Sequence, residues 1–167
     1  LLSVMAGMYA VYHGPKGLRY IANKVHAVAA TTANELTKLG YEQTNSAFFD
    51  TIVVKADAQK IKVVAEQNNI NFFYIDEATV SIAFNETTSI EDVAKIVSIF
   101  AAAKGTQAPE ITELTVTNHF PEELNRTSSF LQHDVFNKYH SESAMMRYIK
   151  MLERKDLSLN HSMISLG

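Results

Sequence analysis

Two neighbouring residues near the end of the chain, His161 and Ser162, are of types that can take part in catalysis. A histidine can gain or lose a proton close to neutral pH, so His161 is a candidate general acid or base. A single histidine in a loop of Ser and Asn residues is also a common hydrogen-bonding anchor. Ser162 has no visible triad partner, so a turn residue bonded to the backbone is its simpler interpretation. The pair alone does not make a catalytic centre.

A second polar group precedes this pair. His133 and His140 are separated by seven positions with Asn137 between them, so they would share one face of a helix and could act as metal ligands. Zinc sites need three or four ligands, and no carboxylate stands at a matching spacing, so we expect no metal site. Asp134, Asn137 and His140 are better interpreted as polar contacts between domains.

Length and composition exclude several classes of function. A chain of 167 residues with 47% hydrophobic content can bury a core, and its length allows one domain with an appendage. The formal charge of -3 leaves no basic stripe for a nucleic acid, so no nucleic-acid partner is expected. The chain has no Cys, which removes disulfides, thiolate nucleophiles and Cys-based zinc sites. The apolar run at residues 1–12 is shorter than the roughly 20 residues that cross a bilayer, so we expect a soluble protein with no membrane partner.

Residues 1–40 predict two helices. The first covers the apolar residues 1–12, and residues 14–17 (Gly-Pro-Lys-Gly) break it, because proline lacks an amide hydrogen and glycine is conformationally permissive. The second helix covers residues 18–39 with apolar side chains at helical spacing, and Gly40 ends it in the left-handed conformation. Helices that begin a chain usually follow a polar cap, and none is present here, so we expect the chain to be cut from something larger.

Residues 48–84 predict three strands and a helix. Residues 48–55 are β-branched and aromatic and predict a strand, and Asp57 then caps a helix that ends at Asn68 and Asn69. Residues 70–75 and 79–84 predict an antiparallel hairpin. One face of this hairpin would be buried, with the side chains of Phe72, Tyr74, Val80, Ile82 and Phe84.

A further helix completes this part of the chain. Ser89 and Asp92 predict a capping box at its start, and an Ala-rich tail ends it before Gly105. The order of helices and strands predicts an α+β fold in which helices cover one face of a small sheet.

The remaining residues predict a connector and one more helix. Residues 105–129 are rich in Thr and Ser with weak periodicity, so we expect them to join two structural units. Ser141 and Ser143 are competing caps for a helix at residues 142–155. Its inward side chains would be Met145, Tyr148, Ile149 and Leu152, and this short segment supplies little surface to cover them.

Several stretches of the chain carry a resemblance to a known family: residues 9–18, 48–51 and 70–72, and above all residues 126–128 and 130–167. The stretches 136–142 and 152–159 are long enough that chance similarity is remote. These residues resemble the P-protein family of the glycine cleavage system, whose members are glycine dehydrogenases (decarboxylating). The resemblance covers nearly the whole chain and is weakest at residues 103–124.

This resemblance implies a fold and a domain organisation. The family is similar to two fused copies of a fold-type I pyridoxal-phosphate (PLP) enzyme, which belong to the α/β class. Residues 1–104 would be the small C-terminal domain of the first copy, with residues 1–13 ending a large-domain helix. Residues 105–129 would connect it to residues 130–167, the start of the second copy. The Schiff-base lysine of the family lies in a motif beyond Gly167, so this chain alone would bind no cofactor and have no activity.

The resemblance also implies a function for the parent protein. It would use pyridoxal 5'-phosphate to decarboxylate glycine and would pass the aminomethyl group to the lipoyl arm of H-protein. Its partners would be H-protein, the other glycine cleavage proteins and the other half of the parent enzyme, with a homodimer as the full-length form. It would be cytoplasmic in a bacterium and in the mitochondrial matrix of a eukaryote.

The family also suggests where chemistry lies closest to this chain. Its loop that starts at residues 161–164 continues past Gly167 into a segment that lines the active centre, so His161 and Ser162 would lie near that centre. The family usually has Pro where this chain has Ser165, and the loss of that φ constraint would loosen the loop. No residue of this segment is expected to be catalytic, to bind the cofactor or to bind a metal.

Two other interpretations remain open if the resemblance is set aside. One is a non-catalytic interaction or regulatory module, because the chain contains no complete catalytic set. The other is the small domain of a different PLP enzyme, such as a relative of serine hydroxymethyltransferase or of a decarboxylase. A Schiff-base lysine in the neighbouring sequence would favour an enzyme over a module.

Overall fold

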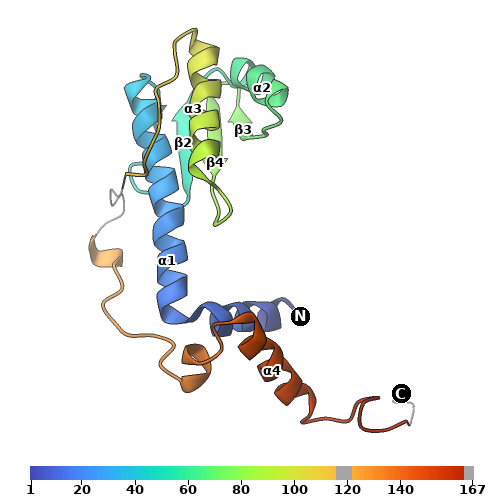
Figure 1. The fold of residues 1–167 in the computed structure, drawn as a ribbon. Helices are drawn as coiled ribbons and strands as arrows, with labels where there is room; N and C mark the ends of the chain where they lie inside the picture. Colours follow the sequence, from blue (N-terminus) through green and yellow to red (C-terminus); the bar gives the residue numbers. More distant parts are fainter. Residues whose placement is uncertain (116–121, 164–167) are drawn as a thin grey trace. The chain divides into compact units, whose positions relative to one another are not determined.

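The computed structural model describes residues 1–115 and 122–163 and divides the chain into two compact units. The sheet unit is Ile21–Asn125, and the terminal unit joins Leu1–Tyr20 to Arg126–Gly167. An antiparallel sheet with its helices makes the fold α+β, as the sequence predicts (Figure 1). The division into residues 1–104, 105–129 and 130–167 stays a prediction. No helix within the described ranges has both the length and the apolar content needed to cross a lipid bilayer.

A kink divides the first helix, α1 (Leu2–Lys38), at Gly14. Gly14 has φ 61° and ψ -178°, a combination that is open essentially to glycine alone. Pro15 takes the first position of the second helical segment, where a helix needs no amide hydrogen and the fixed φ of proline suits it. The predicted break is therefore confirmed at Gly14 but is shorter than residues 14–17. At the far end Gly40 adopts the predicted left-handed conformation.

Helices α2 (Ala58–Gln67) and α3 (Ile90–Lys104) start at the caps that the sequence predicts. The Asp57 carboxylate accepts a hydrogen bond from the Lys60 backbone N–H at 3.0 Å, which satisfies one free donor of the first turn of α2. Ser89 and Asp92 exchange the two hydrogen bonds of a capping box at the start of α3.

Four strands pair antiparallel in the order β1-β2-β4-β3. Their bounds are Glu42–Gln43 (β1), Thr51–Lys55 (β2), Phe73–Asp76 (β3) and Thr79–Ala83 (β4). The predicted hairpin is formed by β3 and β4. In β2 and β4, Ile52 lies opposite Ile82 and Val54 lies opposite Val80, so these buried side chains share one face of the sheet. With side chains of α1, α2 and α3 they form one core, whose largest fully buried members include Phe100, Leu36 and Ile61.

Strand β2 starts at Thr51, later than the predicted residue 48. The reason is a contact with α1: His26 Nδ1 lies 2.9 Å from the Phe49 carbonyl oxygen, and the two rings stack with their centroids 5.6 Å apart. The backbone before Thr51 therefore bonds to a side chain and does not extend the sheet.

Two other strand differences also have local causes. Strand β3 starts at Phe73 and not at residue 70, because the Ile70 N–H donates to the Ala65 carbonyl at 2.9 Å and so closes the end of α2. Strand β1 was absent from the prediction because it has only 2 residues, too few to show an alternating pattern.

The terminal unit contains the start of α1, a short 3-10 helix, η2 (Asp134–Asn137), and α4 (Glu142–Glu153). Of the two competing serines, Ser141 is the cap, because its Oγ accepts a hydrogen bond from the Ala144 N–H at 3.3 Å. The prediction that Ile149 faces inward is wrong within this chain, since 45% of that residue is exposed. Helix α4 has no buried residue at all.

Candidate functional site

Two of the polar residues singled out from the sequence line a small pocket of the terminal unit, beside the kink of α1. The pocket has a volume of about 330 Å³. Its walls come from both sides of the kink, from the last residue of η2 and from the segment that follows: His13, Gly14, Pro15, Lys16, Asn137 and His140.

His140 joins this segment to the kinked helix. Its Nδ1 lies 2.7 Å from the Tyr12 carbonyl oxygen, 128 positions away in sequence. A carbonyl oxygen only accepts hydrogen bonds, so Nδ1 must carry the hydrogen, and Nε2 of the neutral ring is left as an acceptor. Tyr12 lies in the last turn before Gly14, where the carbonyl groups of a helix lose partners within the helix. The histidine therefore bonds to a backbone carbonyl group in the turn before the kink.

Gly14 makes this contact sterically possible. A Cβ atom at this position would lie 2.6 Å from His140 Cε1 and 2.6 Å from the Phe136 carbonyl oxygen, closer than real Cβ contacts come. The Phe136 carbonyl oxygen is part of the backbone, and the His140 ring could move away only by giving up its hydrogen bond to Tyr12. The sequence marks Gly14 only as a helix breaker, and its role in the approach of His140 was missed, because the contact joins residues far apart in the chain.

Asn137 and Asp134 form hydrogen bonds with residues close to them in sequence. Asn137 Nδ2 donates to the carbonyl oxygens of Leu131 and His133, both at 3.1 Å, and so holds the turn that leads into η2. The Asp134 carboxylate pairs with the Lys138 ammonium, and this hydrogen bond lowers the pKa of Asp134. Both side chains are exposed, so the pair adds little to stability. The assignment of Asp134, Asn137 and His140 as contacts between domains stays a prediction.

His161 and Ser162 lie in a turn built on Ser158. The N–H groups of His161 and Ser162 both donate to the Ser158 carbonyl oxygen, at 2.9 and 3.0 Å. The Ser158 hydroxyl lies 3.1 Å from His161 Nδ1. Asn160 Nδ2 donates to Glu153 Oε1 at 3.3 Å, which ties the turn to the end of α4. The later part of the predicted loop, with Ser165, lies outside the described residues.

His133, the other histidine considered as a metal ligand, contributes its backbone to the turn before η2. The carbonyl oxygen of His133 accepts from Asn137, and the side chain of His133 makes no capping hydrogen bond. Within residues 1–115 and 122–163, no three His, Asp or Glu side chains come together in a way that could hold a metal ion.

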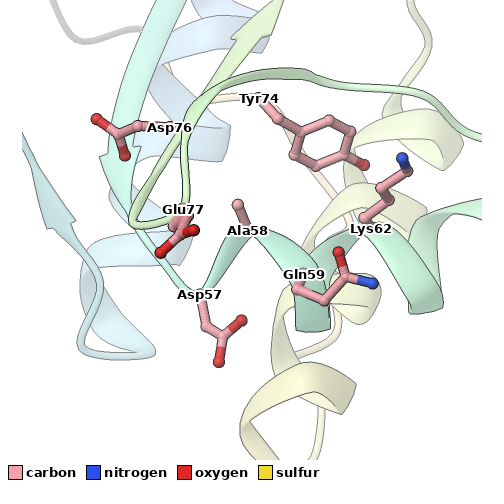
Figure 2. Close-up of a pocket in the computed structure, with 7 residues that line it drawn as sticks. All are labelled: Asp57, Ala58, Gln59, Lys62, Tyr74, Asp76 and Glu77. Carbon is pink, nitrogen blue, oxygen red and sulfur yellow. The ribbon is translucent and has the colours of Figure 1, made fainter.

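A larger pocket lies in the sheet unit, between the start of α2 and the β3–β4 turn, with a volume of about 670 Å³. Figure 2 shows the carboxylates of Asp57, Asp76 and Glu77 on one side of it and the side chains of Tyr74 and Lys62 on the other. Asp57 caps α2, and Asp76 Oδ1 accepts from the Ala78 N–H at 2.8 Å. Burial raises the pKa of the Tyr74 hydroxyl, which makes it a weaker acid. Two of the three carboxylates already serve the fold, so this pocket is the weaker candidate.

Comparison with known proteins relates the chain to one family. The model of the family "Glycine cleavage system P-protein" matches residues 1–100. Glycine dehydrogenase (decarboxylating) of Flavobacterium johnsoniae is 69% identical over all 167 residues, which make up 18% of that protein. The enzyme of the same name from Bacteroides fragilis is 41% identical and is also covered over 18% of its length. The mitochondrial enzyme of Solanum tuberosum is 46% identical and is covered over 16%. The chain thus spans less than a fifth of the length of these relatives.

Proposed function

This chain belongs to the glycine cleavage system P-protein family, and from that premise we propose that it is one segment of a longer glycine dehydrogenase (decarboxylating). The observation that carries the proposal is the 69% identity to such an enzyme over every residue of the chain. The 18% share of that enzyme explains why a complete catalytic set does not have to lie within these residues.

The reaction that we assign to the parent protein starts from glycine. Carbon dioxide leaves, and the remaining aminomethyl group passes to the lipoyl arm of H-protein. Pyridoxal 5'-phosphate would supply the electron sink for the negative charge that decarboxylation leaves on carbon. Protein groups would supply orientation and charge, and the parent would act as a homodimer.

The described residues do not fit a PLP site by themselves. A lysine that binds this cofactor needs a desolvated position that lowers its pKa, and each described lysine is exposed or half-buried. Most are also engaged: Lys24 donates to the Glu86 carbonyl oxygen, for example, and Lys104 donates to those of Leu39 and Gly40. We therefore assign the cofactor to other parts of the polypeptide and an architectural role to this segment.

The domain organisation follows the family resemblance. Residues 1–104 would form the small domain of a fold-type I half, residues 105–129 a connector, and residues 130–167 the start of the second half. The antiparallel sheet with three helices against it supports this assignment for the first part. His161 and Ser162 would then lie near the active centre, and the turn on Ser158 supports a role in holding a loop in shape more than in proton transfer. The compartment would be the cytoplasm of a bacterium or the matrix of a mitochondrion.

Carboxyl exchange tests the function. The parent protein, loaded with PLP, should incorporate labelled bicarbonate into the carboxyl group of glycine, and lipoylated H-protein should accelerate this exchange strongly. Exchange that is indifferent to H-protein would favour a different PLP enzyme, and no exchange under any condition would favour an interaction module.

A second measurement tests the segment itself. Residues 1–167 incubated with PLP and borohydride should give no more of a reduced pyridoxyl adduct than an unrelated protein with the same lysine content. A stoichiometric adduct would place the cofactor lysine within this chain and contradict the architectural assignment.

A further inference from the structure

We propose that His140 is a positioning residue: its hydrogen bond to the Tyr12 carbonyl oxygen seats α4 on the kink at Gly14 and, through α4, holds the turn that carries His161 and Ser162. This inference rests on the proposed function only in its last step, which takes that turn to be close to the active centre.

The first step is the anchor. Gly14 adopts a conformation reserved for glycine and leaves no space for a Cβ atom between the helix and His140. The Tyr12 carbonyl oxygen is offered at the kink, and the His140 ring donates to it at 2.7 Å. A glycine-only conformation, a close approach and a short hydrogen bond coincide at one point of the terminal unit.

The second step runs from the anchor to α4. On one side of His140, Tyr139 stacks on Tyr148 of α4, with ring centroids 4.3 Å apart and planes 18° apart. On the other side, Ser141 caps the first turn of α4. No residue of α4 is fully buried, so packing along the helix adds less to its placement than it would for a core helix. The three consecutive residues 139–141 therefore set where α4 points.

The third step runs from α4 to the turn. Glu153, the last residue of α4, accepts hydrogen bonds from Lys150 Nζ at 2.9 Å and from Asn160 Nδ2 at 3.3 Å. Asn160 lies inside the turn in which His161 and Ser162 donate to Ser158. A shift of α4 is thus transmitted to the turn through the Glu153–Asn160 contact.

Two substitutions distinguish the effect of the hydrogen bond from the effect of the size of the His140 side chain. His140→Asn places an amide N–H where Nδ1 stands, so it keeps the donor to Tyr12. His140→Gln carries the same amide one bond farther along, where Nε2 stands, and misses the carbonyl oxygen. His133→Ala is the matched control, because that histidine is also exposed and its side chain makes no capping hydrogen bond.

The full-length parent protein is the sample, and amide hydrogen exchange of residues 155–163 is the first readout. We expect exchange to be about tenfold faster in His140→Gln and unchanged in His140→Asn and His133→Ala, because only the first loses the anchor. This readout needs no enzymatic activity. Equal protection in the Gln and Asn variants would overturn the positioning role whatever reaction the parent catalyses.

Steady-state kinetics is the second readout. We expect His140→Gln to lower kcat on the order of tenfold with KM for glycine nearly unchanged, because misplacing a loop costs orientation more than binding. His140→Asn should stay close to the parent value. If the wild-type protein shows no exchange of labelled bicarbonate into glycine that depends on H-protein, only the proposed function is contradicted. If His140→Gln exchanges the amides of residues 155–163 faster but keeps the parent kcat, the result contradicts only the position of the turn near the active centre.

Discussion

At the scale of single residues, Gly14 meets two demands that no other residue type meets together. Its φ of 61° with ψ of -178° excludes side chains through backbone strain, and the 2.6 Å approach to Phe136 and His140 excludes them through contact. Gly7 offers a natural comparison in the same helix. It has no positive φ, and a Cβ there would meet nothing within 4 Å.

Alanine at these two glycines should have opposite effects. Gly14→Ala should lower the free energy of local unfolding around the kink by about 3 kcal/mol, because backbone strain and overpacking add. Gly7→Ala should raise it by about 0.5–1 kcal/mol, because glycine is a poor residue inside a helix. Hydrogen exchange of residues 5–20 in the parent protein measures both. A Gly14→Ala protein as protected as the wild type would show that the kink tolerates a side chain.

At the scale of elements, ends governed by neighbours in sequence could be predicted, and ends governed by distant residues could not. Asp57, Ser89 and Gly40 mark helix ends because their partners lie within a few positions. The start of β2 depends on His26, which lies 23 positions from Phe49, and no local pattern encodes that contact. The same holds for the candidate site: His140 can be predicted from its side-chain chemistry, but its distant partner Tyr12 cannot be predicted from the sequence.

The cap of α4 gives a prediction for one element. Ser141→Ala should weaken the first turn of α4 by about 1 kcal/mol, because the Ala144 N–H loses its acceptor. Ser143→Ala should be neutral or slightly stabilising, because Ser143 lies inside the helix, where alanine is preferred. Exchange rates of the amides at residues 144–146 distinguish the two variants. Equal effects would mean that the two serines share the capping role.

The start of α2 should respond to acid. The hydrogen bond from the Lys60 backbone lowers the pKa of Asp57 in the folded protein. The folded state therefore stabilises the Asp57 carboxylate relative to the unfolded chain. That stabilisation is present above the unfolded pKa, which is about 4, and is lost as the pH falls through the lower, folded value. Protection of the α2 amides should therefore decline below about pH 4.

Asp57→Asn is the control for this acid response. Its amide oxygen still accepts the bond to Lys60 but does not titrate, so the α2 amides should show less protection at neutral pH and no further loss in acid. The same acid response in the Asp57→Asn protein would assign it to another carboxylate.

At the scale of the whole molecule, burial is distributed unevenly between the two units. The sheet unit has a continuous apolar core centred on Phe100, Ile52 and Leu36. In the terminal unit, α4 exposes Met146 and Ile149, which lie three positions apart on one side of the helix, and buries no residue. The chain makes up 18% of its bacterial relatives, so the rest of such a polypeptide is the natural cover for this apolar surface.

That cover makes a prediction about α4 in the parent protein. Ile149→Gln should lower the free energy of unfolding by about 2 kcal/mol, because a side chain buried by the rest of the polypeptide would lose its apolar contacts. Arg147→Gln introduces the same residue two positions away, on the opposite side of the helix, and should change stability by less than about 0.5 kcal/mol. Thermal or urea unfolding of the two full-length variants, measured side by side, shows whether Ile149 is buried by the rest of the polypeptide or exposed to solvent. If the Ile149→Gln protein is as stable as the Arg147→Gln protein, the Ile149 side of α4 is exposed to solvent in the parent. The architectural role of the segment would then rest on the sheet unit and the Gly14 kink alone.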